Sequence, residues 1–279
     1  MYNLISRNMD FFNVLDVPVN STMNVELKAY MELIITDIFS KNNLRKHLHG
    51  FSSLVAKLNH YFFVPDVSAR FPQLCEGALL SLSISNTSSS NSFFLSKVEE
   101  DLEPWNPILL QLQHFAILEY VKNDGSEIQH ISKLICKSSL GLHTPLEISD
   151  YNDIYSATHA VISGSIYGRR LLCNLFPTRT TYDYFKYFQH AFFFSLLDHH
   201  YDLAVETLIA SCLLFELSIS DRKTIENEID YIDTNIFQNQ RINHITRTNF
   251  KDYYHLLLVR IILECQGQFK NVGFRQKEM

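Results

Sequence analysis

Residues 182–217 form a run of 36 positions without glycine or proline. A single helix over this run would be about 54 Å long, roughly three times the radius of gyration of about 19 Å expected for a compact chain of 279 residues. The polar residues 198–202 therefore predict a break between two helices. The triplet Phe192-Phe193-Phe194 is expected in the core.

Apolar residues recur at helical spacing through most of the remaining chain. No two segments with alternating apolar and polar residues flank a turn dipeptide, as the strands of a β-hairpin would. This pattern predicts an all-α protein of about ten helices, packed as antiparallel hairpins in one compact multi-helix domain over residues 1–279. The other expected helices cover residues 24–40, 43–63, 73–84, 107–123, 126–140, 150 to 164 or 168, 220–233 and 249–266.

A Ser/Asn-rich patch at residues 85–92 is the best candidate for a domain boundary. It would separate an N-terminal helical part, residues 1–84, from a main part, residues 93–279. The alternative is a surface loop within one domain. We favour the loop, because the helices before the patch are strongly apolar and need a partner to pack against.

Composition excludes several classes of protein. Hydrophobic residues make up 46% of the chain, which is too much for a disordered protein. The net charge of −6 offers no basic surface for nucleic acid or an anionic membrane, so neither is expected as a partner. With only 8 glycines in the chain, Gly-rich phosphate loops are not expected.

The cysteines and the apolar runs indicate a cytoplasmic protein. The five cysteines have no C-x-x-C spacing, and we expect buried, reduced thiols. The strongest apolar run, residues 191–197, is much shorter than the about 20 residues that a bilayer crossing needs. The first residues do not resemble a signal peptide.

The densest group of polar residues surrounds the expected break. If the second helix begins near His199, then His199, Asp202 and Glu206 share one stripe, which could hold a divalent metal ion or carry out acid–base chemistry. Ile209 and Leu213 continue the stripe, so Glu206 can point inward. The alternative is an ordinary helix start, with Asp198 as N-cap, Asp202 in the first turn and Glu206 exposed.

Two further histidines lie on other expected helices. His159 follows Thr158, and His255 follows Tyr254. Each alone is more often a core histidine than a ligand, but sites in helical bundles are built from facing helices. Candidate catalytic residues are therefore Asp202 and Glu206 as bases, with His159 as proton carrier. The candidate metal ligands are His159, His199, Asp202, Glu206 and His255.

The segment that follows His159 carries a recognisable pattern. Thr158-His159 is followed by Ser165-Ile166-Tyr167-Gly168, with the glycine nine residues after the histidine. The pattern resembles a Thr-His, Thr-Asp-aromatic-Gly signature of an uncharacterised bacterial family of all-α proteins. Ile166 stands where that family has aspartate.

Two later segments also resemble signatures of that family. They are Asp202-Leu203-x-x-Glu206 and Tyr254-His255, so the resemblance covers roughly residues 150–266. The resemblance implies an all-α fold. Its signatures contain the same polar residues that helical spacing singles out. The family has no established activity to carry over, and if its aspartate is catalytic, Ile166 means that this chain lacks that function.

These observations lead to one functional hypothesis and one alternative. The hypothesis is an internal His/Asp/Glu pocket that binds a metal ion or a small or peptide substrate, in a protein that could be a tailoring enzyme on a peptide or small metabolite. A divalent metal is the cofactor to consider. The alternative is a non-catalytic helical scaffold that binds a partner protein or peptide in an exposed apolar groove.

Overall fold

The computed structural model describes residues 1–13, 23–41, 44–62, 79–80, 95, 107–141, 150–238 and 245–265. These residues contain eleven α-helices and no strand, so the all-α prediction is confirmed. The α-helices are α1 (Tyr2–Arg7), α2 (Met23–Phe39), α3 (Leu44–His47), α4 (Phe51–Phe62), α8 (Ile108–Lys122), α9 (Ile128–Lys137), α10 (Tyr151–Gly164), α11 (Thr178–Leu197), α12 (Tyr201–Leu214), α13 (Ile219–Ile232) and α14 (Tyr254–Cys265). Short turns of other helix types are η1 (Met9–Phe12), η4 (Leu172–Asn174), η5 (Asp233–Gln238) and η7 (Phe250–Asp252).

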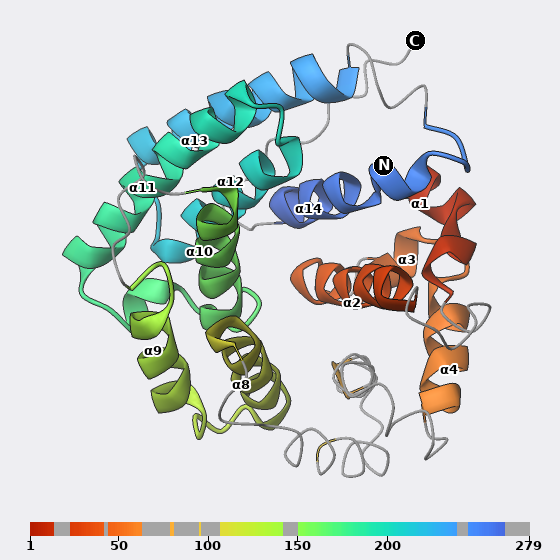
Figure 1. The fold of residues 1–279 in the computed structure, drawn as a ribbon, viewed down its shortest axis with the longest axis horizontal. Helices are drawn as coiled ribbons and strands as arrows, with labels where there is room; N and C mark the ends of the chain where they lie inside the picture. The colour runs from red at the N-terminus through yellow and green to blue at the C-terminus, as the bar shows by residue number, and fades with distance from the viewer. Residues whose placement is uncertain are drawn as a thin grey trace.

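Helix α12 lies at the centre of the described fold. Every residue from 203 to 214 is buried, so the helix is covered on all sides, as its apolar sequence requires. It packs against α11, α10 and α14 (Figure 1). The break predicted at residues 198–202 is confirmed, because α11 ends at Leu197 and α12 begins at Tyr201.

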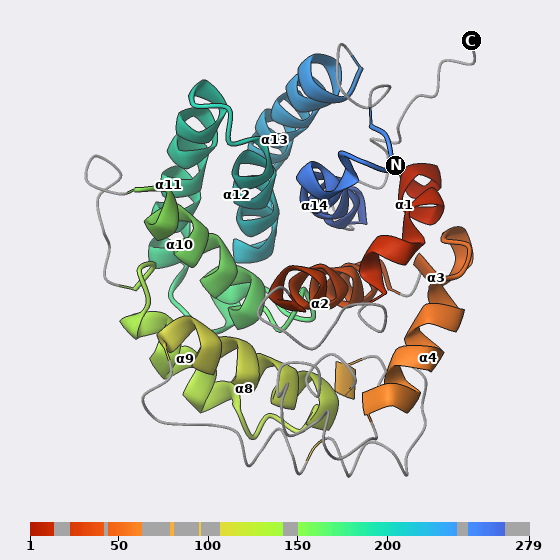
Figure 2. The same ribbon diagram turned by 45° about the vertical axis from the view of Figure 1, so that its right-hand side comes forward.

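Two rows of helices extend outward from α12. On one side α14 packs on α12, and α2 packs on α14; on the other side α10 packs on α12, then α8 on α10 and α9 on α8. Figure 2 shows α14 between α12 and α2, with α8 and α9 below α10. Helices from both halves of the sequence therefore surround the space between α2, α8, α10 and α14.

Several predicted boundaries shift for local reasons. The helix expected at residues 43–63 is divided into α3 and α4 at Gly50, whose φ of +86° is left-handed. Helix α10 begins as expected at Asp150, which accepts a hydrogen bond from the Asp153 amide at 2.9 Å and forms a capping box with Asp153. The helix expected from Asn249 begins only at Tyr254, after the 3₁₀ turn η7.

Two expectations about burial are wrong. Phe192 is buried, but Phe193 is 56% exposed, because consecutive helical residues are about 100° apart and cannot all face one core. Cys136, Cys173, Cys212 and Cys265 are free thiols, but only Cys212 is buried, whereas Cys136 is exposed.

Some predictions fall outside the described residues. They are the Ser/Asn patch at 85–92, nearly all of the helix expected at 73–84, and Cys75. The division into domains and the cytoplasmic location stay predictions. In the part of the chain that the structure describes, no helix is both long enough and apolar enough to cross a membrane.

Candidate functional site

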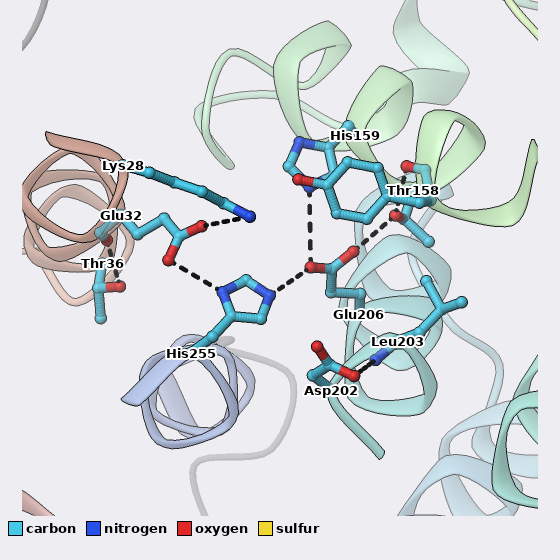
Figure 3. A network of polar contacts seen from close by, with 10 residues as sticks. Lys28, Glu32, Thr36, Thr158, His159, Asp202, Leu203, Glu206 and His255 are labelled. Carbon is cyan, nitrogen blue, oxygen red and sulfur yellow. Dashed lines mark hydrogen bonds and ion pairs between the residues drawn. The ribbon is translucent and has the colours of Figure 1, made fainter. Parts of the chain in front are cut away.

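Three helices from distant parts of the chain bring acidic and imidazole side chains together. Glu206 lies on the central helix α12 and is 1% exposed, so the inward orientation is correct and the exposed alternative is wrong. His255 projects from α14 and Glu32 from α2 (Figure 3). Because α12 is surrounded on all sides, any charged side chain in its middle must find its partners inside the protein.

His255 joins the two carboxylates in one chain of hydrogen bonds. Its Nε2–H donates to Glu206 Oε1 at 2.9 Å, and its Nδ1–H donates to Glu32 Oε2 at 3.0 Å (Figure 3). Thr158 on α10 donates its hydroxyl to the other oxygen of Glu206 at 2.8 Å. The Lys28 Nζ atom, one turn earlier on α2, lies 3.6 Å from Glu32 Oε1. Glu206, His255 and Glu32 therefore connect α12, α14 and α2.

The charges of this chain are mutually stabilising. Burial by itself would raise the pKa of Glu206, but His159 and His255 outweigh it and hold that pKa well below its ordinary value. Burial would likewise lower the pKa of His255, but Glu206 and Glu32 raise it to about 10. At neutral pH the site therefore contains a buried imidazolium between two carboxylates, with both imidazole N–H groups already donated.

His159 differs from His255 because its hydrogen-bonding capacity is not used. Its Nε2 atom lies 3.7 Å from Glu206 Oε1, is buried, and has no hydrogen-bond partner among the described residues. The His159 ring packs against the Tyr155 ring, and the two ring centroids are 4.0 Å apart. Burial, followed by the nearby carboxylates, raises the pKa of Tyr155, which therefore keeps its proton at neutral pH.

A cavity of about 340 Å³ opens beside this network. Its polar wall contains Lys28, Glu32, His159, Glu206 and His255, and the rest of its lining is mostly apolar. The apolar lining comes from α2, α8, α10, α14 and the residues next to α8 and α10, namely Met31, Ile35, Pro107, Leu109, Leu110, Ile162, Tyr167, Leu258, Val259 and Ile262. This volume is in the range of sites that hold small organic molecules.

Two of the predicted site residues lie outside this network of hydrogen bonds. His199 is in the turn before α12 with a left-handed φ of +63°, so it does not share a helical stripe with Glu206, and its Nδ1 is 2.7 Å from the Tyr201 hydroxyl. Asp202 lies in the first turn of α12, accepts a hydrogen bond from the Leu203 amide and, with His199 and His255, lines a neighbouring cavity of about 200 Å³. An ion pair and a hydrogen bond thus join His159 and His255 to Glu206, whereas His199 and Asp202 only share the lining of the neighbouring cavity with His255.

Sequence reasoning missed Glu32, Lys28 and the role of Thr158. Glu32 had a detectable signal, because it is the one charged residue among residues 29–35, which are otherwise apolar or aromatic. Thr158 is fully buried, and a buried hydroxyl beside a histidine needs an acceptor. No pattern in the sequence indicates that α2 lies against α14, so the pairing of Glu32 with His255 could not be found that way.

The metal ligand set predicted from spacing is not assembled. Within the described ranges, no group of three or more His, Cys, Asp or Glu side chains is arranged to hold a metal ion. Both ring nitrogens of His255 donate to carboxylates, so a metal ion there would have to displace these hydrogen bonds.

Comparisons of the chain with protein-family models, curated protein sequences and solved structures find no match. The resemblance to a bacterial all-α family therefore stays a prediction. At the position where that family has aspartate, Ile166 is 1% exposed and belongs to the apolar core.

Proposed function

We propose that this protein binds a small amphipathic molecule in the 340 Å³ cavity and exchanges a proton with it through His159, as an enzyme that modifies a peptide or small metabolite would. The observation that carries the proposal is the position of His159, between a buried carboxylate and a largely apolar cavity. Imidazole is the side chain best suited to proton transfer near neutral pH.

The other ionisable groups of the wall are less suited to this role. His255 donates both N–H groups and has no lone pair to offer. Glu206, with its lowered pKa, is a weak proton acceptor. His159 is the histidine of the wall that offers a ring nitrogen to a ligand, and Glu206 is the residue that orients it.

Glu206 also determines which nitrogen of His159 is available. A carboxylate facing Nε2 favours the tautomer with the proton on that atom, which leaves the lone pair on Nδ1. No described residue forms a hydrogen bond with Nδ1, and the ring lines the cavity. A ligand hydroxyl or other weakly acidic group at Nδ1 could therefore transfer its proton to His159. Asp202, which lines the other cavity, has no part in this step.

The apolar lining indicates the remainder of the ligand. Ile35, Leu110, Leu258 and Ile262 offer a hydrophobic surface next to the polar wall. A molecule with an apolar body and one polar end would bury its body there and place the polar end at His159. The convergence of His159, Glu206 and His255 supports a pocket over the scaffold alternative, in which these residues would scatter over the surface.

Binding can be tested with p-cresol and N-acetylphenylalanine methylamide as probes. We expect at least one compound to stabilise the protein in thermal melts, since a ligand at a hundredfold excess over its Kd contributes about 2.7 kcal/mol. Leu110→Trp should remove this effect, because Leu110 is 48% exposed at the cavity and a larger ring would fill the space. Ile219→Trp is the matched control, since Ile219 is 89% exposed and does not line this cavity.

Proton transfer can be measured separately by ultraviolet difference spectra of bound p-cresol over a range of pH, because the phenolate absorbs at longer wavelength than the phenol. Wild-type protein should lower the pH at which bound p-cresol ionises, and His159→Asn should abolish this shift while the fold survives. The exposed His190 provides the control substitution His190→Asn. If no compound binds, if Leu110→Trp binds normally, or if the shift in p-cresol ionisation persists without His159, the proposal is wrong.

A further inference from the structure

A third cavity, of about 380 Å³, lies between α11 and α13, the pair of helices at the upper left of Figure 1. Its lining comes from two turns of α11 and one face of α13 and consists of Phe192, Phe193, Leu196, Leu197, Asn227, Glu228 and Tyr231. It shares no lining residue with the cavity at His159. Neither the sequence patterns nor the proposed function assigns it a role.

Glu228 is the unusual member of this lining. It is only 5% exposed, yet neither carboxylate oxygen has a hydrogen-bond partner among the described residues. A buried carboxylate without a partner is costly, and native proteins rarely contain one without a functional reason. Burial raises the pKa of Glu228 to about 7, and the nearby Gln189 side chain offsets this rise only in part.

The walls around Glu228 are apolar and extend to the surface. Phe193 is 56% exposed, Leu197 78% and Tyr231 54%, and all three line the cavity. Large apolar side chains that cluster at the surface of a protein commonly mark a binding site. The described lining of this cavity thus consists of exposed apolar side chains at its entrance and one buried acidic side chain, Glu228.

We propose that this cavity binds an amphipathic organic amine, with its ammonium group on Glu228 and its aliphatic or aromatic tail between Phe193, Leu197 and Tyr231. An ammonium group supplies the hydrogen-bond donors and the positive charge that the two carboxylate oxygens of Glu228 lack. The tail covers apolar surface that is otherwise exposed. An anionic or neutral ligand would leave the carboxylate without a counter-charge.

A free small molecule fits this site better than the lysine side chain of a partner protein. The cavity volume is sufficient for a whole ligand, since small-molecule sites span roughly 300–1,000 Å³. The site also offers a single charged group, which suits a monoamine with one polar end.

The test uses n-hexylamine as the probe at pH 7.5, with 1-hexanol and hexanoate as neutral and anionic analogues of the same length. Binding is followed by NMR of the Phe193 and Tyr231 ring signals. We expect hexylamine to bind at least tenfold more tightly than hexanol, and hexanoate more weakly than either.

Glu228→Gln keeps the shape of the side chain and removes its charge, so it should abolish the preference for the amine while hexanol still binds. Retained hexanol binding also shows that the variant is folded. Asp230→Asn, at an exposed position on the same helix, is the matched control and should leave the preference intact. Leu110→Trp should not affect this site.

Three outcomes would overturn the proposal. The first is equal affinity for hexylamine and hexanol, or no binding of either. The second is an amine preference that survives in Glu228→Gln. The third is tighter binding of N-acetyllysine methylamide than of hexylamine, which would identify a polypeptide lysine as the occupant.

Discussion

A single carboxylate, Glu206, lies at the centre of the polar network beside the 340 Å³ cavity. It is the one charged residue in the buried stretch of α12, and four side chains from three other helices converge on it or on its partner His255. The cost of burying this charge is offset by the imidazolium of His255 and by the Thr158 hydroxyl. If one partner is removed, the remaining charge stays buried without compensation.

We therefore expect Glu206→Gln to lower the free energy of unfolding by about 3 kcal/mol, because breaking a buried ion pair leaves His255 with only one carboxylate. Urea denaturation at pH 6 would measure this change. Glu216→Gln is the matched control, since Glu216 is exposed and its loss should change the stability by less than about 0.5 kcal/mol.

The pH dependence of that difference follows from the two pKa shifts. The pKa of Glu206 is lowered, so its contribution is present above its ordinary value of 4.5 and is lost as the pH falls. The pKa of His255 is raised from 6.5 to about 10, so its contribution is complete below 6.5 and is lost as the pH rises toward 10. The difference between wild type and variant should thus be largest from pH 4.5 to 6.5. A difference that grows toward pH 10 would contradict this account.

At the scale of elements, the position of His159 depends on how α10 is held. The capping box at Asp150 fixes the start of the helix. Near the other end, Gly164 lets α10 approach α9 closely, since a Cβ atom there would lie 2.4 Å from Ile135 Cδ1 and 3.1 Å from Leu172 Cδ1. Both neighbouring side chains are fully buried and have little room to move.

We expect Gly164→Ala to destabilise the protein by about 1–2 kcal/mol, even though alanine is the better helix former. The cause is overpacking against Ile135, so the double variant with Ile135→Val, which removes Cδ1, should recover part of the loss. Thermal or urea denaturation of the single and double variants would measure this coupling. If the two effects simply add, the close approach of α10 to α9 is not the cause.

Helix boundaries were predicted well where a local signal existed and poorly where none did. Asp150 marks the start of α10 and the polar residues 198–202 mark the end of α11, and both positions were correct. Asn249 is the first residue of the helix expected at 249–266, but its side-chain oxygen accepts a hydrogen bond from the Thr246 amide at 2.7 Å, and no side-chain cap forms. The same residue type can stabilise a turn or a helix, and sequence alone does not separate the two.

At the scale of the whole molecule, the first described residues pack along the last described helix. Phe11 and Phe12 form edge and tilted ring contacts with Phe250 and Tyr254, at 5.0–6.0 Å between centroids. In both ribbon views α1 lies beside α14 (Figures 1 and 2). This contact supports α14, and α14 carries His255.

Phe12→Ala should therefore lower the free energy of unfolding by about 3–5 kcal/mol, since Phe12 is completely buried. Hydrogen exchange should increase in α14 more than in α9, which lies on the far side of the fold. The matched control is Phe193→Ala, because Phe193 is 56% exposed. Equal acceleration in α9 and α14 would mean that the N-terminal residues do not support α14 specifically.

The sequence by itself determined the all-α class and the break between α11 and α12, but it left both directions of Glu206 open. The class and the break depend on local periodicity and on the burial of apolar neighbours, which can be read within a few turns of helix. Only the tertiary structure decided that Glu32 joins the site, that His199 and Asp202 do not, and that Phe193 borders a cavity with Glu228 at depth. Those facts depend on which helices meet, and helices that meet here are as far apart as Glu32 and His255, 223 residues along the chain.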